Sequence, residues 1–228
     1  MREMTKTENL FSKPYMTIAS DFISQFTYPW EALSHIKDYI IELGKTLSPE
    51  KFDNPSENVW IAKSAKVFPS AYIGSPCIID ENAEVRHCAF IRGSAIVGKN
   101  SVVGNSTELK NVILFDNVQV PHYNYVGDSI LGYRSHMGAG SITSNVKSDK
   151  TLVFVKPSCN DIIGEDIETG LKKFGAMLGD FVEVGCNSVL NPGTVIGKNT
   201  NIYPTSCVRG FVTEDSIYKD KEHVIRKV

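Results

Sequence analysis

Two basic residues, Arg92 and Lys110, are the clearest candidates for binding chemistry in this sequence. Each directly follows an aliphatic residue, and the two lie 18 residues apart. The aliphatic spacing described below makes 18 residues one full structural turn, so the two cations are expected to stack. Like charges held this close repel each other unless an anion bridges them. The pair therefore indicates a site for a phosphate or carboxylate, with two solvated surface cations as the alternative.

His122 is a candidate general base. It lies in a segment of aromatic and polar residues, Val120 to Asp128, where the regular aliphatic spacing has shifted by one residue. A neutral imidazole oriented by a carboxylate is the usual base near pH 7. Glu108, fourteen residues earlier, is the carboxylate that we expect to orient it. A purely structural histidine is the alternative.

A pair of glycines follows His136, in the segment Met137-Gly-Ala-Gly140. Such a pair indicates a place where the backbone approaches a ligand or another chain closely. The segment does not satisfy the dinucleotide-binding fingerprint, because Thr143 replaces the last glycine and no helix is expected to follow.

A repeat of six residues must position these side chains. Aliphatic residues recur at this spacing in two unbroken runs. The first run is Ile61, Val67, Ile73, Ile79, Val85, Ile91, Val97, Val103 and Leu109, and the second is Leu178, Val184, Leu190, Ile196, Ile202 and Val208. Between the runs the register slips by one at Leu114 and again at Leu131.

A period of six is typical neither of an amphipathic helix nor of a simple half-buried strand. Short strands joined by turns explain it, with each aliphatic residue pointing inward and small residues near the bends. Three such strands make one coil, and equivalent side chains of successive coils stack about 4.8 Å apart. We therefore predict a mainly β fold, a single-stranded parallel β-helix of roughly seven coils. A β-sandwich is the alternative, but its strand spacing would vary.

We divide the chain into an N-terminal helical cap, a solenoid and a C-terminal tail. These are residues 1–55, 56–212 and 213–228. Residues 29–43 carry one apolar stripe between Pro29 and Gly44 and are expected to form a helix that covers the open first coil or packs on a neighbour. The repeat stops at about residues 146–173, where a loop or hairpin is expected to leave the coil.

The composition narrows the class of function. The chain has 228 residues and a formal charge of −2, which argues against a general nucleic-acid binder. No apolar run is long enough to cross a membrane, and the polar N-terminus is unlike a signal peptide. Five scattered cysteines without a CxxC motif indicate reduced thiols and therefore a cytoplasmic protein.

The motifs resemble those of a known family. The tandem six-residue units are similar to the hexapeptide-repeat acyltransferases, whose coils wind left-handed, against the usual crossover rule. The segments Tyr125-Val-Gly-Asp-Ser-Ile-Leu-Gly132 and Gly138-Ala-Gly-Ser-Ile-Thr-Ser-Asn145 resemble the acetyltransferase domain of bifunctional enzymes that join a sugar-1-phosphate nucleotidyltransferase to a glucosamine-1-phosphate N-acetyltransferase. The archaeal-type branch is the most similar, because it has an insertion before a lysine-rich segment, here Lys172-Lys173-Phe174. The likeness covers about residues 60–212.

The resemblance implies a role for individual residues. It places the cations that bind phosphate and sugar at Arg92, Lys110 and Lys173, the catalytic histidine at His122, the sugar-binding tyrosine at Tyr125 and the motif asparagine at Asn145. Acetyl-CoA would run along a groove between subunits, past Ala139, Cys186, Pro204 and Arg209. The resemblance also implies a homotrimer with its active sites between subunits, and no requirement for a metal.

The chain departs from the family pattern in two ways. His136 occupies a position where the family usually has asparagine, so we assign it to the substrate site with altered contacts. The glycine-rich loop of the nucleotidyltransferase is not found in the N-terminal part, so nucleotidyl transfer is not expected of this chain.

The implied reaction transfers an acetyl group from acetyl-CoA to the amine of a hexosamine 1-phosphate, a step in nucleotide-sugar synthesis such as the UDP-GlcNAc pathway. His122 would accept the proton, Glu108 would hold its tautomer, and a backbone N–H near Ala139 would stabilise the oxyanion.

Three alternatives remain at this point. The chain is a non-catalytic scaffold that binds a sugar phosphate, or an acyltransferase with another acceptor, or a γ-class carbonic anhydrase on the same fold. The last needs three converging histidines. His87, His122 and His136 are available, but no two of them are close in sequence.

Overall fold

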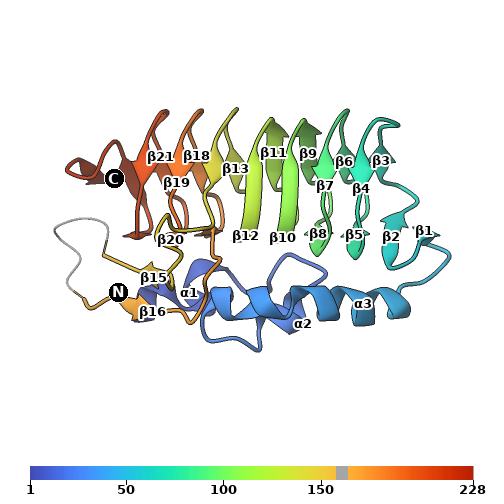
Figure 1. Ribbon diagram of the computed structural model, residues 1–228, viewed down its shortest axis with the longest axis horizontal. Coiled ribbons are helices and arrows are strands. Elements are labelled where there is room, and N and C mark those ends of the chain that lie inside the picture. Colours follow the sequence, from blue (N-terminus) through green and yellow to red (C-terminus); the bar gives the residue numbers. More distant parts are fainter. Residues whose placement is uncertain (158–163, 228) are drawn as a thin grey trace.

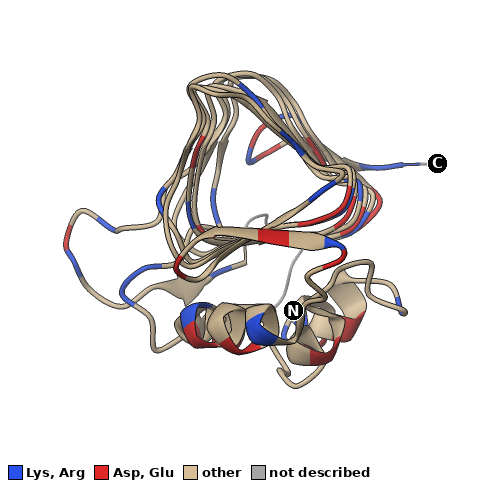
Figure 2. Ribbon diagram, turned by 90° about the vertical axis from the view of Figure 1, so that its right-hand side faces the viewer, with Lys and Arg blue, Asp and Glu red and all other residues tan. Residues whose placement is uncertain are grey.

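The chain folds into a parallel β-helix whose cross-section is a triangle, with the N-terminal helices along one side (Figures 1 and 2). The computed structural model describes residues 1–157 and 164–227. Strands account for 34% of the described residues and helices for 13%, and the solenoid has about nine turns. The predicted β-helix is confirmed, with more turns than the roughly seven that we derived from the repeat.

The first side of the triangle is named the arm face, because the N-terminal segment covers it. It contains β2 (Val59–Ala62), β5 (Cys77–Ile79), β8 (Ala95–Val97), the second halves of β10 (Glu108–Leu114) and β12 (Tyr125–Leu131), and then β17 (Ala176–Leu178), β20 (Thr194–Ile196) and β23 (Phe211–Val212). Strand β1 (Phe52–Ser56) pairs antiparallel with β2 at the first turn, and all other pairs on this face are parallel.

The second side is the cation face. It contains β4 (Tyr72–Ile73), β7 (Phe90–Ile91), the first halves of β10 and β12, and then β14 (Ile142–Thr143), β19 (Val189–Leu190) and β22 (Cys207–Val208).

The third side is the histidine face. It contains β3 (Lys66–Val67), β6 (Glu84–Val85), β9 (Val102–Asn105), β11 (Gln119–His122), β13 (His136–Met137), β18 (Glu183–Val184), β21 (Asn201–Ile202) and β24 (Ser216–Tyr218), with β25 (Val224–Arg226) antiparallel to β24. Because β24 pairs parallel with β21, the ladder continues past residue 212, where we had placed its end.

The six-residue repeat supplies the interior of the solenoid. On the cation face, for example, Ile91, Leu109 and Val126 are fully buried at register-matched positions of three successive coils. Successive coils also approach closely at the bends. A Cβ at Gly104 would overlap the carbonyl group of Pro121 in the next coil, so only glycine fits there. The stack is thus a continuous apolar core in which each coil covers the next.

The N-terminal arm, residues 1–50, packs along the arm face of the solenoid (Figure 1). It contains the short elements η1 (Glu3–Thr5), α1 (Thr7–Leu10), α2 (Ser20–Ile23) and η2 (Pro29–Ser34), and the longer helix α3 (Ile36–Thr46). Helix α3 contacts β5, β8 and β10, and η2 contacts β12. The helix predicted over residues 29–43 is therefore divided at His35, with a 3₁₀ segment before it.

The position of the arm differs from the cap that we expected over the first coil. Strands of the arm face carry apolar residues at inward and outward positions alike, so they do not alternate as a solvated strand would. The outward residues are fully buried under the arm: Ile78, Ile96, Ile113, Ile130, Met177 and Val195. The arm lies along the side because this row must be removed from water.

The insertion after β14, the fifth strand of the cation face, leaves the coil as a short hairpin. Strands β15 (Phe154–Val155) and β16 (Ile167–Glu168) pair antiparallel, and residues 158–163, with Cys159, lie outside the described part. None of the helices in the described part of the chain is long and apolar enough to cross a bilayer.

Candidate active site

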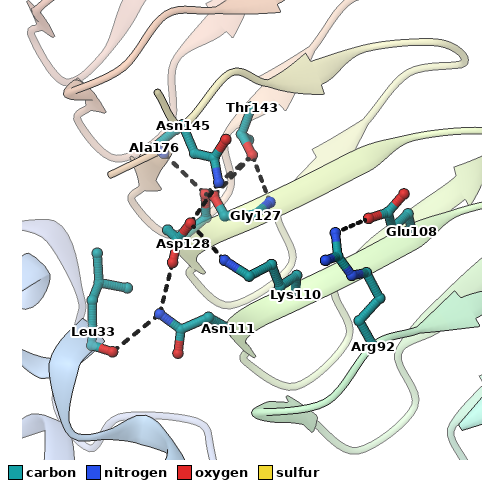
Figure 3. A network of polar contacts seen from close by, with 11 residues as sticks. Leu33, Arg92, Glu108, Lys110, Asn111, Gly127, Asp128, Thr143, Asn145 and Ala176 are labelled. Atoms are coloured by element: carbon teal, nitrogen blue, oxygen red, sulfur yellow. Dashed lines mark hydrogen bonds and ion pairs between the residues drawn. The ribbon is translucent and has the colours of Figure 1, made fainter. Parts of the chain in front are cut away.

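Arg92 and Lys110 follow equivalent positions on the cation face. Ile91 and Leu109 pair in register between β7 and β10, so the two basic residues come next to each other on neighbouring coils. Each has a carboxylate partner that the sequence analysis did not assign. An Arg92 Nη atom lies 2.8 Å from Glu108, and Lys110 Nζ lies 3.5 Å from Asp128 (Figure 3). These carboxylates relieve the repulsion from which we inferred a bridging anion.

Tyr125 and Asn145 join these cations on the same face. Tyr125 begins β12 and pairs in register with Glu108, and Asn145 follows β14. Burial raises the pKa of the Tyr125 phenol, and the negative charges of Asp128 and Glu108 raise it further. A hydrogen bond with Asn145 and the charge of Arg92 oppose this rise. The phenol therefore stays protonated at neutral pH and remains a hydrogen-bond donor.

Lys173 reaches this face where the chain returns from the insertion. The backbone N–H of the next residue, Phe174, donates to the carbonyl oxygen of Asn145 over 3.0 Å. The Lys173 side chain is exposed, and among the described residues it has no hydrogen-bond or ion-pair partner. The structure thus brings four predicted substrate residues, Arg92, Lys110, Tyr125 and Asn145, to the cation face, and the residue after Lys173 contacts the backbone of Asn145.

His122 lies at the corner between the histidine face and the cation face, three residues before Tyr125. Its Nδ1 atom lies 3.4 Å from the side-chain oxygen of Asn105, its register partner on β9. Because an amide oxygen only accepts hydrogen bonds, the neutral imidazole makes this contact as the Nδ1–H tautomer, in which Nε2 has a lone pair. The free lone pair is what a general base requires.

The hydrogen bonds of the described residues do not include the predicted contact between Glu108 and His122. Glu108 is on β10 of the cation face and its carboxylate holds Arg92, whereas His122 ends β11 on the histidine face. A spacing of fourteen residues is shorter than one coil, so it places the two residues on different sides of the triangle. Asn105, seventeen residues before His122, occupies the position that contacts the imidazole.

Three of the residues predicted to contact acetyl-CoA continue the corner that starts at His122. The backbone N–H of Gly140 donates to the His122 carbonyl group over 3.1 Å, and that of Asn187 donates to Ala139 over 2.8 Å. In the next coil the Thr205 N–H donates to Cys186 over 2.8 Å, and Pro204 directly precedes Thr205. Ala139, Cys186 and Pro204 thus lie along one edge of the solenoid, in the three coils that follow the coil of His122.

Arg209 does not lie on this edge. Strand β22 separates it from Pro204, and it lines a pocket of about 660 Å³ between the insertion and the last coils. The pocket walls include three further cations, Lys147, Lys156 and Lys221, and the ring of Phe154. Lys147 and Lys156 come from the insertion, which has no repeat pattern, so sequence spacing gave no signal for them.

His136 is not brought to the cation face. It begins β13 on the histidine face, and its Nδ1 atom lies 2.8 Å from the carboxylate of Glu183 in the neighbouring coil. This geometry does not support its predicted substrate role. Its side chain is held on the histidine face, whereas Arg92 and Lys110 lie on the cation face.

The three histidines of the carbonic anhydrase alternative have separate partners. His87 contacts Ser70, His122 contacts Asn105 and His136 contacts Glu183. Within the described residues, no group of three or more His, Cys, Asp or Glu side chains is placed to hold a metal ion.

Comparisons with known proteins show which proteins the chain resembles. A family model described as the GMPPB C-terminal domain matches residues 74–174. A protein of Methanococcus maripaludis strain C5 named "Bifunctional protein GlmU" is 34% identical over 203 residues, which are 88% of this chain and 48% of that protein. A "Bifunctional sugar-1-phosphate nucleotidylyltransferase/acetyltransferase" of Sulfurisphaera tokodaii is 26% identical to this chain. The match covers 95% of this chain and 54% of that protein.

Among solved structures, the polySia-specific acetyltransferase NeuO is 15% identical to this chain. The match has a TM-score of 0.48 and covers 72% of this chain and 80% of that one. The chain spans about half the length of the curated relatives that it matches, and the matched part is their C-terminal half. The chain is therefore related along most of its length to the C-terminal half of the bifunctional GlmU proteins, as its motifs predicted.

Proposed function

We propose that this protein transfers the acetyl group of acetyl-CoA to the amine of a hexosamine 1-phosphate such as glucosamine 1-phosphate. The observation that carries the proposal is that residues suited to the acceptor and a candidate base lie on one side of the triangle and at its edge. Arg92, Lys110, Tyr125 and Asn145 lie on the cation face, and His122 lies three residues before Tyr125 with one imidazole nitrogen free to accept a proton.

The phosphate of the acceptor binds to Arg92, Lys110 and Lys173. A guanidinium has five N–H donors and an ammonium three, so the contacts with Glu108 and Asp128 leave donors for phosphate oxygens. Lys173 has no partner among the described residues and adds a whole positive charge. Tyr125 and Asn145 donate to the sugar hydroxyl groups.

The amine attacks the thioester carbonyl carbon as its neutral form. A nitrogen–carbon bond forms, the carbonyl π electrons move to oxygen, and the backbone N–H of Ala139 stabilises that oxyanion. His122 Nε2 takes the proton from nitrogen while Asn105 holds Nδ1. The carbon–sulfur bond then breaks, and the imidazolium returns its proton to the CoA sulfur.

Acetyl-CoA lies along the edge formed by Ala139, Cys186 and Pro204, with Arg209 beyond it at the pocket of the insertion. A homotrimer would place this edge in a groove between subunits, as the family resemblance implies. The reaction supplies an N-acetylated sugar phosphate to nucleotide-sugar synthesis, in the UDP-GlcNAc pathway. The four described cysteines are free thiols, in keeping with the cytoplasmic location that we propose.

The test is release of CoA when the purified protein is given acetyl-CoA and glucosamine 1-phosphate. His122→Ala should lower the rate by about 10²-fold or more, the usual contribution of a general base. His223→Ala is the matched control, because the imidazole of this exposed histidine contacts Asp220 in the C-terminal tail, away from the proposed site, and its rate should match the wild type. Equal rates for the two variants would refute the assigned base.

A second candidate function is a sugar-phosphate-binding scaffold without catalysis. The observation that favours it is that the chain itself neutralises Arg92 and Lys110, and that an amide rather than a carboxylate contacts His122. Tight binding of glucosamine 1-phosphate without CoA release would favour the scaffold.

A further inference from the structure

Asp128 is a buried carboxylate at the corner between the cation face and the arm face. The residue is only 4% exposed, and its backbone φ of +47° lies in the left-handed region. A buried charge is costly unless partners surround it, and an aspartate adopts this φ less readily than glycine does. Its place in the fold therefore requires an explanation from its contacts.

Its partners are the polar side chains of the coils on both sides (Figure 3). Asn111 in the preceding coil donates to Oδ1 over 2.9 Å, and Asn145 in the following coil donates to Oδ2 through a short hydrogen bond. Lys110 Nζ lies 3.5 Å from Oδ2. Asn111, Asp128 and Asn145 thus form a corner column, one residue from each of three successive coils.

Only an ionised carboxylate suits the middle of the corner column. Both neighbouring amides present N–H groups to it, and the ammonium of Lys110 presents a third donor. An asparagine has one acceptor oxygen, so its own NH₂ group would face at least one of these donors. The column is therefore specific for a carboxylate at position 128.

The N-terminal arm contacts both ends of the corner column. The Asn111 amide also donates to the carbonyl oxygen of Leu33 in η2 over 3.1 Å. Trp30, in the same element, stacks on Phe174 with ring centroids 5.7 Å apart, and the Phe174 N–H donates to the Asn145 carbonyl group. One segment of the arm thus reaches the side chain at one end of the column and the backbone at the other.

We propose that Asp128 is a positioning residue, which holds Lys110 and Asn145 in place for the acceptor, and that η2 of the arm fixes the column in which it stands. The proposal rests on the proposed function in so far as it names the acceptor site. Asp128 does not touch the reacting atoms. It sets where the ammonium of Lys110 and the amide of Asn145 point, and so it controls acceptor binding rather than acetyl-CoA binding.

The experiment compares Asp128→Asn with the wild type in the full-length chain. The variant is nearly isosteric, and a cooperative thermal transition shows that it folds. We expect its KM for glucosamine 1-phosphate, and its calorimetric Kd for the same ligand, to rise about tenfold or more, which corresponds to the loss of one charge-assisted hydrogen bond. The KM for acetyl-CoA should stay within about twofold of the wild type. A merely structural role would raise both constants together.

A second readout does not depend on the acceptor. Hydrogen exchange of the backbone amides at residues 30–34 should become faster in Asp128→Asn, because the column no longer holds η2, while residues 84–85 on the histidine face should be unchanged. Tyr39→Phe, in the arm but outside these contacts, is the matched control and should change neither region.

The outcomes separate the two proposals. If the wild type neither binds nor acetylates glucosamine 1-phosphate, the proposed function fails and hydrogen exchange alone decides the role of Asp128. Unchanged exchange at residues 30–34 would overturn the positioning role. So would an equal rise of both KM values in a variant that still folds.

Discussion

The cations at residues 92 and 110 are each held by a carboxylate of this chain, so an incoming phosphate has to share them. Arg92 and Glu108 are both partly exposed, and such pairs contribute little to stability. A phosphate that competes with Glu108 therefore loses little free energy. Lys110 is different, because its partner Asp128 is buried and cannot move into solvent.

Asp80 is a second buried carboxylate, at a bend after β5. Its Oδ1 accepts the Glu81 N–H over 2.7 Å, whereas its Oδ2 has no hydrogen-bond partner among the described residues. Burial raises the pKa of Asp80, although the Glu81 N–H and Lys99 oppose the rise. The ionised form therefore costs free energy in the folded state at neutral pH.

This pKa shift predicts the pH dependence of stability. A carboxyl whose pKa is higher in the folded than in the unfolded chain binds protons more tightly when folded, so its unfavourable contribution disappears as the pH falls through the folded pKa. Asp80→Asn is neutral at every pH. The stability of the variant relative to the wild type should therefore be greater at pH 7 than at pH 4. Denaturant unfolding at the two pH values measures this difference.

The control for this prediction is Asp53→Asn, which changes an exposed carboxylate with one long contact to Lys63. Its stability relative to the wild type should hardly change between the two pH values. A pH-independent difference for Asp80→Asn as well would contradict the assigned cost of the buried charge.

At the scale of the elements, the arm is part of the hydrophobic core. Ile113 of β10 is fully buried at an outward position of the arm face, on the side where α3 packs. Truncation of such a residue removes apolar contacts and leaves a cavity. The arm therefore stabilises the strands that carry Lys110 and Asn111 in addition to contacting their side chains.

Truncation of this residue tests the packing of the arm. Ile113→Ala should lower the free energy of unfolding by about 2–5 kcal/mol. Ile225→Ala is the matched control, since this isoleucine in β25 is 47% exposed, and its cost should stay below about 1 kcal/mol. Denaturant unfolding measures both values. Similar losses in the free energy of unfolding for the two variants would show that the arm does not bury the outward residues of this face.

The interior of the solenoid could be predicted from sequence because its spacing is local. A residue such as Leu109 has to point inward whatever surrounds the coil, and the period of six records that requirement. The position of the arm could also have been predicted, because the strands that it covers contain three successive apolar residues, Cys77–Ile79 and Ala95–Val97. Strands that are apolar on both sides need a cover.

The partners of the site residues could not be predicted in the same way. Spacing gave the stacking of Arg92 with Lys110, but it could not show that Glu108 turns toward Arg92 instead of His122. That choice depends on which side of the triangle each residue faces, and the register shift after residue 109 obscured it. Asp128 was visible in the motif, yet its role arises only when three coils bring its partners together.

At the scale of the whole molecule, the solenoid is a rigid stack that presents the two proposed binding regions on adjoining surfaces. The cation face carries the residues proposed for the acceptor, and the edge from His122 to Pro204 carries those proposed for acetyl-CoA. Because every coil is hydrogen-bonded to the next, the two regions keep a fixed relation. Catalysis by positioning needs this kind of fixed geometry.

The central claim is that the two regions act together on an amino sugar that carries a phosphate. The most direct measurement is mass spectrometry of the product after the wild-type protein has been incubated with acetyl-CoA and either glucosamine 1-phosphate or free glucosamine. The account predicts N-acetylglucosamine 1-phosphate in the first reaction and at least about tenfold less acetylated sugar in the second. No acetylated product in either reaction, with glucosamine 1-phosphate still bound, would contradict it.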